Sequence, residues 1–114
     1  MGICCDVTDY KKLEELLKPH QPFDILINNA GVLEPEPFLT QKEETYDQTM
    51  NVNLKAPFFV TQVVARAMVE HKVAGVVLNV SSVGSKKHGG HNHPYRLSKA
   101  GLDHLSQCLA VEFG

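Results

Sequence analysis

A tyrosine and a lysine stand four residues apart in the stretch HNHPYRLSKAG, residues 91–101. Residues at this spacing lie on one face of a helix, roughly 5–6 Å apart at their Cβ atoms, so the polar ends of Tyr95 and Lys99 can reach one small volume. A fixed ammonium group favours the ionised form of a nearby phenol, which suits the phenol to proton transfer near neutral pH. The pair taken alone is equally compatible with an ordinary pair on a helix surface.

A pair of serines precedes this tyrosine. Ser81 and Ser82 end the apolar run AGVVLNVSS, and Ser82 stands 13 residues before Tyr95. A hydroxyl group at the end of a strand can hydrogen-bond an oxygen atom on which negative charge develops during a reaction. The combination of Ser82, Tyr95 and Lys99 therefore predicts acid–base chemistry at an oxygen atom.

Three short apolar runs predict buried strands. Each is too short for a helix, and each is continuous rather than alternating, as in parallel strands that are covered on both faces. The runs occupy residues 2–6, 23–28 and 75–81.

Helical spacing of apolar residues follows each of these runs. The predicted helices cover residues 9–18, 41–71 and 95–113. Thr8 or Asp9 is expected to cap the first helix, and Pro57 is expected to bend the second. The inner face of the second helix is predicted to contain Val52, Phe59, Val60, Val63, Val64, Ala67 and Met68. The inner face of the third is predicted to contain Leu97, Ala100, Gly101, Leu102, Leu105, Cys108, Leu109 and Val111.

The alternation of strand and helix predicts a doubly wound α/β fold with a parallel sheet, a fold that binds its ligands just beyond the carboxyl ends of the strands. The polar residues that could bind a ligand or take part in catalysis fall at those ends. Asp6 follows the first run, residues 28–31 follow the second, and Ser81 and Ser82 end the third.

The composition limits the kinds of partner. The chain has 114 residues, of which 43% are hydrophobic and 21% charged, and its net charge is −2. This balance lacks the basic excess that nucleic acids and anionic membranes require, so small molecules are the expected partners. No apolar run reaches the roughly 20 residues that span a bilayer, and three cysteines make a poor disulfide framework, so a cytoplasmic location is expected.

Three histidines lie in the glycine-rich loop before Tyr95. His88, His91 and His93 have metal-like spacing, but no cysteine or carboxylate lies beside them in the sequence. We therefore predict no metal site. The loop connects Ser82 to Tyr95, so these histidines are expected to lie near the candidate residues.

Five short motifs occur in a fixed order: CDVTD, NNAG, NVNL, LNVSS and YRLSKAG. With this order and spacing the sequence resembles the short-chain dehydrogenase/reductase family along essentially its whole length. Two longer stretches, VARAMVEHKVAGVVLNVSS and NHPYRLSKAGLDHL, are similar to the dicarbonyl/L-xylulose reductase branch of that family.

The resemblance implies a catalytic role for four residues. Tyr95 matches the family's acid/base, which gives its proton to a carbonyl oxygen as hydride arrives, and Lys99 matches the lysine that holds the nicotinamide ribose. Ser82 matches the serine that polarises the carbonyl group, with Ser81 as the alternative. Asn53 matches an asparagine that holds a water molecule between the lysine and solvent, although a polar residue at a helix kink is an alternative interpretation.

The resemblance also implies that NAD or NADP is the cofactor. Asp6 and Val7 match residues that contact adenine, and Asn29, Ala30 and Gly31 match the turn that touches the adenosine ribose. Asp6 could equally serve as a turn or cap residue. The residues that distinguish NAD from NADP have no counterpart in the sequence.

The resemblance further implies that residues 1–114 form the central part of a single NAD(P)-binding domain, since the first two strands, the glycine-rich turn and the C-terminal strands of this fold have no counterpart here. In the strand order 3-2-1-4-5-6, runs 23–28 and 75–81 are neighbours, whereas run 2–6 is not adjacent to either. We expect the two later strands to pair, the first to be detached, and residues 1–114 alone to be inactive.

Two interpretations of the function are therefore open. In the first, the parent protein is a homodimeric or homotetrameric oxidoreductase that acts on a small carbonyl or alcohol. In the second, the chain is a non-catalytic, truncated isoform that pairs through the helices of residues 41–71 and 95–113.

Overall fold

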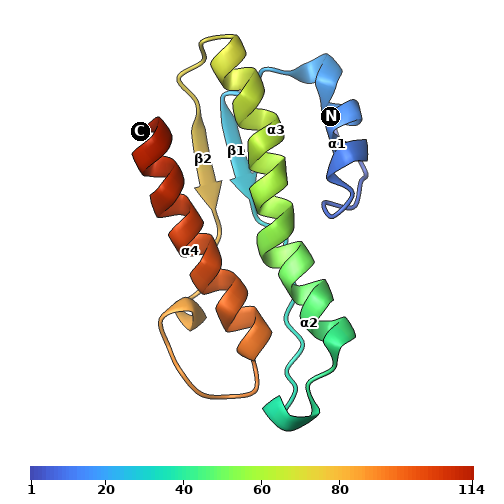
Figure 1. The fold of residues 1–114 in the computed structure, drawn as a ribbon. Helices are drawn as coiled ribbons and strands as arrows, with labels where there is room; N and C mark the ends of the chain where they lie inside the picture. Colours follow the sequence, from blue (N-terminus) through green and yellow to red (C-terminus); the bar gives the residue numbers. More distant parts are fainter.

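The computed structural model describes residues 1–114 as two parallel strands with helices beside them (Figure 1). In chain order the main elements are α1 (Tyr10–Leu17), β1 (Ile25–Asn28), α2 (Glu43–Met50), α3 (Ala56–Glu70), β2 (Val76–Asn79) and α4 (His93–Phe113). Short 3₁₀ turns cover Lys18–His20, Phe38–Thr40 and Val83–Ser85, and a π-helical segment, Asn51–Lys55, joins α2 to α3.

The sheet consists of β1 and β2, which pair in parallel. Ile25 lies opposite Val76, and Asn28 lies opposite Asn79 at the carboxyl end. Parallel neighbours require a crossover connection, which α2 and α3 supply. The predicted pairing of the two later apolar runs is confirmed.

The first apolar run does not form a strand, which corrects the prediction for residues 2–6. Residues 1–4 are exposed and have no regular structure. A strand needs a neighbour that accepts and donates its backbone hydrogen bonds. Because β1 and β2 pair with each other, the run has no ladder partner, and its detachment agrees with the strand order expected for this fold.

Helix α1 begins as the sequence predicts. The Asp9 side chain accepts a hydrogen bond from the Lys12 backbone N–H at 3.2 Å, so Asp9 rather than Thr8 is the capping residue. The helix packs against α3, where the Tyr10 and Phe59 rings stack with their centroids 4.7 Å apart.

The long second helix is interrupted next to its proline. Pro57 has no backbone N–H and cannot complete the usual hydrogen bond to the carbonyl group of Asn53, four residues earlier. The hydrogen bonding widens just before it, where the Ala56 N–H donates to the Asn51 carbonyl five residues back. The predicted irregularity at Pro57 is thus a π-helical turn at residues 51–55.

The core is centred on α3. Val60, Val64 and Met68 form a buried cluster against which side chains of α1 and β1 pack. Among the residues predicted for the inner face, Val63 and Ala67 are also buried, while Val52 and Phe59 are half-buried.

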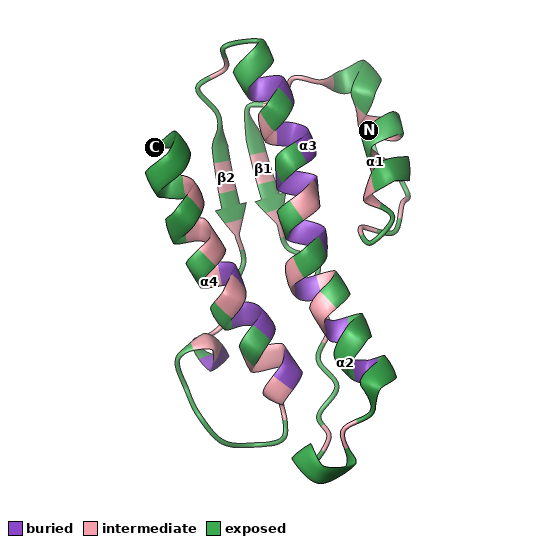
Figure 2. Ribbon diagram, in the orientation of Figure 1, coloured by how far each residue is buried: buried purple, intermediate pink, exposed green.

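Helix α4 is less buried than its apolar spacing predicts. Leu102 is 1% exposed, but Leu97 and Val111 are 58% and 89% exposed, and Ala100 and Cys108 are exposed as well. Figure 2 shows that the C-terminal turns of α4 are largely exposed, whereas its buried residues lie in the N-terminal half. The prediction that Cys108 belongs to the core is wrong, because neighbouring elements contact α4 mainly along one side of that half.

One face of the sheet is open. Residues alternate between exposed and half-buried along both strands, so the expectation of strands covered on both faces is not met. Ile25, Ile27 and Leu78 are 60%, 57% and 52% exposed. The radius of gyration is 15.2 Å, against about 13 Å for a compact domain of this length. None of the helices has the length and hydropathy needed to cross a lipid bilayer.

Candidate functional site

The residues with predicted chemistry converge at the carboxyl edge of the sheet. In Figure 1 both strand arrows point toward the N-terminal half of α4, which carries Tyr95 and Lys99. The chain leaves β1 through Asn29–Gly31 and leaves β2 through Ser81 and Ser82. This convergence follows from the parallel strands, whose carboxyl ends share one edge.

Tyr95 and Lys99 lie on one face of α4, as their spacing predicts. The Lys99 Nζ atom lies 5.8 Å from the centroid of the Tyr95 ring. Lys99 is 4% exposed, and its ammonium group donates a hydrogen bond of 2.9 Å to the carbonyl oxygen of Val80, directly after β2. An ammonium group has three N–H donors, so two remain for other acceptors.

Gly31 lies between the lysine and the asparagine of the predicted site. A Cβ atom at Gly31 would lie 3.6 Å from both the Lys99 Nζ atom and the Asn53 Oδ1 atom. The structure therefore brings three residues, from the β1 loop, the π-helical segment and α4, to one place. The absence of a side chain at Gly31 leaves the ammonium group of Lys99 open on that side.

Asn53 is fully buried and makes three hydrogen bonds with its side chain. Its Oδ1 atom accepts from the Val32 N–H at 2.8 Å, and its Nδ2 atom donates to the Val32 carbonyl oxygen at 2.8 Å. Nδ2 also donates to the hydroxyl oxygen of Ser98 at 3.2 Å. The side chain thus joins the segment after β1 to α4, and all its polar atoms already have protein partners.

Sequence reasoning missed Ser98, which is fully buried. Its hydroxyl group donates to the Tyr95 carbonyl oxygen at 2.6 Å and accepts from Asn53. A serine whose hydroxyl group bonds the carbonyl group one turn earlier is common inside helices. The sequence therefore gave no signal for the second contact of Ser98, with Asn53, which is 45 residues away.

Ser82 lies beside Tyr95 on the other side of the short turn at Val83–Ser85. The Ser82 Oγ atom accepts a hydrogen bond from the Gly84 N–H at 3.1 Å. A Cβ atom at Gly84 would lie 3.4 Å from this Oγ atom and 3.6 Å from the Tyr95 Cε1 atom. The hydroxyl hydrogen of Ser82 stays free to donate toward a group near the tyrosine ring.

Ser81 points to α4 instead. Its hydroxyl group donates to the Lys99 carbonyl oxygen at 3.4 Å. The hydroxyl groups of Ser81 and Ser85 also lower the pKa of Asp103, with a smaller contribution from the positive charges of Lys86 and Lys99. Of the two serines, Ser82 is therefore the one beside the tyrosine ring.

A chain of polar side chains supports the sheet edge and was also missed. Asn28 donates to Asn79, its partner in register, at 2.8 Å and to Thr61 of α3 at 2.9 Å. Asn79 in turn donates to Ser106 of α4 at 2.8 Å. These contacts fix both strands to both helices immediately below the site.

Gly101 allows α4 to approach the π-helical segment closely. A Cβ atom there would lie 2.9 Å from Leu54 Cδ2, nearer than such atoms normally come. A larger residue would require either the Leu54 side chain to turn away or α4, and with it Lys99, to move away from Asn53.

The residues predicted to contact adenosine divide into two groups. Val7, Asn29 and Ala30 line one hollow at the carboxyl end of β1, together with apolar residues of α1 and α3. The Asp6 carboxylate instead accepts hydrogen bonds from the backbone N–H and the hydroxyl group of Thr8, at 2.9 and 2.8 Å, which lower its pKa. This geometry is that of the turn role considered as the alternative for Asp6.

The loop of residues 86–92, here called the histidine loop, lies at the same end of the molecule as Tyr95. His93 contacts Phe38 edge-on, with ring centroids 5.5 Å apart, and the His91 carbonyl oxygen accepts from the Glu36 N–H at 2.8 Å. Side chains of histidine, cysteine, aspartate and glutamate nowhere form a group of three or more suited to a metal ion.

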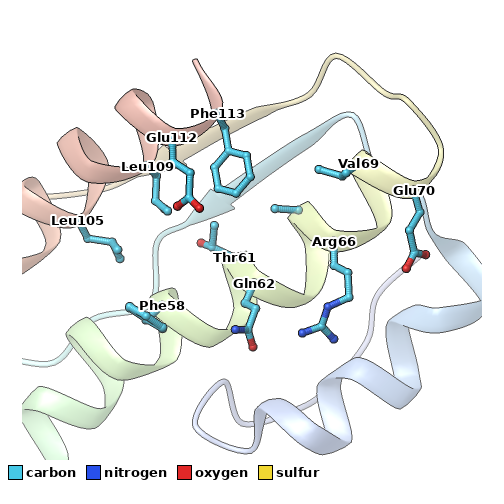
Figure 3. A pocket seen from close by; sticks show the side chains of 11 residues that line it. Phe58, Thr61, Gln62, Arg66, Val69, Glu70, Leu105, Leu109, Glu112 and Phe113 are labelled. Carbon is cyan, nitrogen blue, oxygen red and sulfur yellow. The ribbon is translucent and has the colours of Figure 1, made fainter.

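A separate groove runs between α3 and α4 (Figure 3). Its lining is largely apolar and includes Phe58 and Val69 of α3 and Leu105, Leu109 and Phe113 of α4. Figure 3 shows Leu109 and Phe113 of α4 and Thr61 of α3 directed into the space between the helices, whereas Arg66 and Glu70 point away from α4. Neither Tyr95 nor Lys99 contributes to this groove.

The parallel strand pair with its helical crossover belongs to the doubly wound α/β class, whose sheets bind ligands at the carboxyl edge, where Tyr95 and Lys99 lie. The short chain dehydrogenase family model matches residues 1–114, and the chain belongs to this family.

Curated relatives agree with this assignment. The chain is 38% identical over 112 residues to an L-xylulose reductase of Mesocricetus auratus and to carbonyl reductase [NADPH] 2 of Sus scrofa, and each alignment covers 98% of this chain and 46% of the relative. A D-erythrulose reductase of Gallus gallus is 35% identical with the same coverage. The predicted similarity to the L-xylulose reductase branch is confirmed.

Solved structures share the fold. A 4-hydroxyisoleucine dehydrogenase complexed with NADH superimposes with a TM-score of 0.91 at 31% identity, covering 98% of this chain and 51% of that one. A short-chain type dehydrogenase/reductase from Mycobacterium marinum gives 0.89 at 28% identity, covering 96% and 47%. The chain spans about half the length of the relatives it matches.

Proposed function

We propose that this chain carries the catalytic residues of an NAD(P)-dependent reductase or dehydrogenase that interconverts a small carbonyl compound and its alcohol. The proposal is supported by the position of the Lys99 Nζ atom, 5.8 Å from the Tyr95 ring centroid, and by the Ser82 hydroxyl group, which lies across Gly84 from the Cε1 edge of the same ring. We further propose that residues 1–114 form the central part of a single NAD(P)-binding domain.

The residues present fit a nicotinamide dinucleotide. Val7, Asn29 and Ala30 line a hollow suited to an apolar ring, and Gly31 leaves space beside the Lys99 ammonium group, where a ribose hydroxyl group could accept a hydrogen bond. When bound, the cofactor supplies or accepts the hydride. Asp6, with its carboxylate held by Thr8, offers backbone rather than side-chain contacts to adenine.

The protein's own residues then handle the proton and the oxygen atom. The Tyr95 hydroxyl group gives its proton to the carbonyl oxygen during reduction, and the Ser82 hydroxyl group donates a hydrogen bond to the same oxygen. The buried Lys99 ammonium group stabilises the phenolate that Tyr95 leaves behind. Asn53 positions the Gly31–Val32 segment against Lys99, and the water-holding role suggested by the family stays a prediction.

The relatives' names suggest the substrates to test. The full-length gene product should be assayed with NADPH and NADH against L-xylulose, D-erythrulose and a small α-dicarbonyl compound. Tyr95→Phe keeps the ring and removes the proton donor, so turnover should fall by at least about 10²-fold. Tyr46→Phe, an exposed tyrosine on α2, is the matched control and should leave turnover unchanged. Near-normal turnover in Tyr95→Phe would refute the assignment.

A substitution of the lysine tests the mechanism separately. Lys99→Met removes the positive charge that favours the phenolate, so the alkaline limb of the pH–rate profile should move to higher pH, and NADPH should bind more weakly. An unchanged profile would show that the lysine has no part in proton transfer.

We also propose that the whole protein is a homodimer or homotetramer that associates through α3 and α4. The apolar groove between these helices supports the proposal, with Val69 and Phe113 64% and 62% exposed. Phe113→Asp should lower the mass measured by light scattering, whereas Leu39→Asp, outside the groove, should not. The same groove favours the alternative, a non-catalytic isoform that pairs through these helices. Reductase assays of residues 1–114 and of the full-length product side by side separate the two.

A further inference from the structure

Two loops meet beside the predicted active site. One, residues 33–42, follows β1, and the other, residues 86–92, connects Ser82 to Tyr95; both lie at the lower end of the molecule in Figure 1. Apart from the turns at its own ends, two hydrogen bonds fix the second loop: the Arg96 Nη1 atom donates to the Lys87 carbonyl oxygen at 3.0 Å, and the Glu36 N–H donates to the His91 carbonyl oxygen at 2.8 Å. The half of this loop that leads into α4 therefore depends on how well residue 36 is itself fixed.

The Glu36 side chain fixes that residue with three hydrogen bonds. Its Oε2 atom accepts from the Lys42 backbone N–H at 2.8 Å and from the Gln41 Nε2 atom at 3.1 Å. Its Oε1 atom accepts from the Thr45 hydroxyl group at 2.7 Å, and Thr45 is 7% exposed. Both carboxylate oxygens of Glu36 are thus bound to the start of α2.

The consequence is a continuous connection from α2 to the N-terminus of α4. Glu36 joins the first turn of α2 through its side chain and the histidine loop through its backbone. The edge-on contact between Phe38 and His93 adds a second link between the same two loops. Tyr95 follows His93 by two residues, so this connection ends at the catalytic helix.

We propose that Glu36 is a positioning residue that fixes the histidine loop over Tyr95 and thereby sets which carbonyl compounds the site accepts. The inference deepens the proposed function and rests on it. Hydrogen bonds to a charged acceptor are stronger than those between neutral groups, so one carboxylate with three donors is a rigid support for a loop otherwise rich in glycine.

The test compares three variants of the full-length gene product on the same carbonyl panel. Glu36→Ala removes all three hydrogen bonds and should raise the KM of the carbonyl substrate by about tenfold and change the order of preference among substrates. The KM of NADPH should change by less than about twofold, because Asn53, and not Glu36, holds the Gly31–Val32 segment in place. Glu34→Ala is the control: Glu34 is exposed, lies two residues earlier and makes no side-chain hydrogen bond, so it should behave as wild type.

The conservative variant separates positioning from general destabilisation. In Glu36→Gln the amide oxygen can accept from Lys42 while the amide N–H donates to the Thr45 hydroxyl group, so substrate preference should return to within about threefold of wild type. A loss of thermal stability in Glu36→Ala with unchanged substrate KM and preference would overturn the proposal.

Hydrogen–deuterium exchange provides a readout that does not depend on activity. The amide of residue 36, which donates to the His91 carbonyl oxygen, should exchange faster, relative to its intrinsic rate, in Glu36→Ala than in Glu34→Ala, and equal protection would refute the positioning role even if no substrate is found. If Glu36→Ala does not fold, Glu36→Asp replaces it in the comparison. The shorter aspartate side chain cannot bond the Lys42 N–H and the Thr45 hydroxyl group at the same time. If Tyr95→Phe retains full activity while exchange follows the prediction, the proposed function fails and the loop contact stands.

Discussion

Removal of the Asn53 side chain should destabilise the fold out of proportion to its size. Asn53→Ala leaves the N–H and carbonyl groups of Val32 without partners and removes one of two contacts of the Ser98 hydroxyl group. Each buried group left unsatisfied lowers the free energy of unfolding by about 1–3 kcal/mol, so the expected total for the two Val32 groups is about 2–6 kcal/mol. This is a large part of the roughly 5–15 kcal/mol that stabilises a typical domain.

Urea unfolding of the full-length gene product measures this loss. Asn51→Ala, an exposed residue two positions earlier in the same π-helical segment, is the matched control and should change stability by less than about 0.5 kcal/mol. Equal losses in the two variants would refute the reasoning, because they would show that the hydrogen bonds of Asn53 contribute no more than those of an exposed amide.

A charged replacement at the same position adds a pH signature. In Asn53→Asp, full burial raises the pKa of the introduced carboxyl group in the folded state above its unfolded value of about 3.9; the Lys99 ammonium group and the Val32 N–H oppose this shift, and we expect burial to dominate. A raised folded pKa means that stability is highest at pH values below the unfolded pKa and falls as pH rises through the folded one. The variant should therefore lose more stability relative to wild type at pH 7 than at pH 5, whereas the loss in Asn53→Ala should not depend on pH.

Four further predictions concern core packing, helix packing, the charge of Asp103 and metal binding. Val64→Ala should lower the free energy of unfolding by about 2–3 kcal/mol because it opens a cavity in the core, and Leu39→Ala, at a 95% exposed position outside the groove, should lower it by less than about 1 kcal/mol in the same urea titration. Gly101→Val should weaken NADPH binding through displacement of α4 by Leu54, as measured by fluorescence titration, and unchanged binding would contradict the close packing. The lowered pKa of Asp103 predicts a stabilising effect that is present above about pH 4 and lost as pH falls further, so Asp103→Asn should flatten the acid limb of the stability profile. Zinc should leave activity unchanged, and replacing the three histidines of residues 88–93 by glutamine should alter substrate preference at most; stoichiometric zinc in the purified protein would overturn this.

Local patterns predicted the elements that position the site. The four-residue spacing of Tyr95 and Lys99 fixes their common face whatever the rest of the fold does, and Asp9 marks the start of α1. Short-range geometry determines both features. The parallel pairing of residues 23–28 with 75–81 was predicted instead from the strand order that the family resemblance implied.

Contacts between distant segments could not be predicted in the same way. The hydrogen bonds of Asn53 with Val32 and Ser98 span 21 and 45 residues, and nothing in either segment specifies the partner. The exposure of Cys108 and Val111 depends on which neighbours cover α4, whereas apolar spacing defines only a face. Glu36 was overlooked because a glutamate in a proline-rich loop has no sequence pattern that marks it as the cap of a helix beginning seven residues later.

The π-helical turn at residues 51–55 makes the geometry of the site depend on the number of residues in this segment, so a single insertion or deletion would change it abruptly. Deletion of one residue there would restore α-helical hydrogen bonding and rotate everything on one side of the turn by about 100° relative to the other. If α3 stays in place, α2 rotates and the hydrogen bond between Thr45 and Glu36 breaks. If α2 stays in place, the hydrogen bonds between Asn53 and Val32 break instead. Substitutions can therefore tune this segment gradually during evolution, whereas a one-codon change in its length would separate the two halves of the site at once.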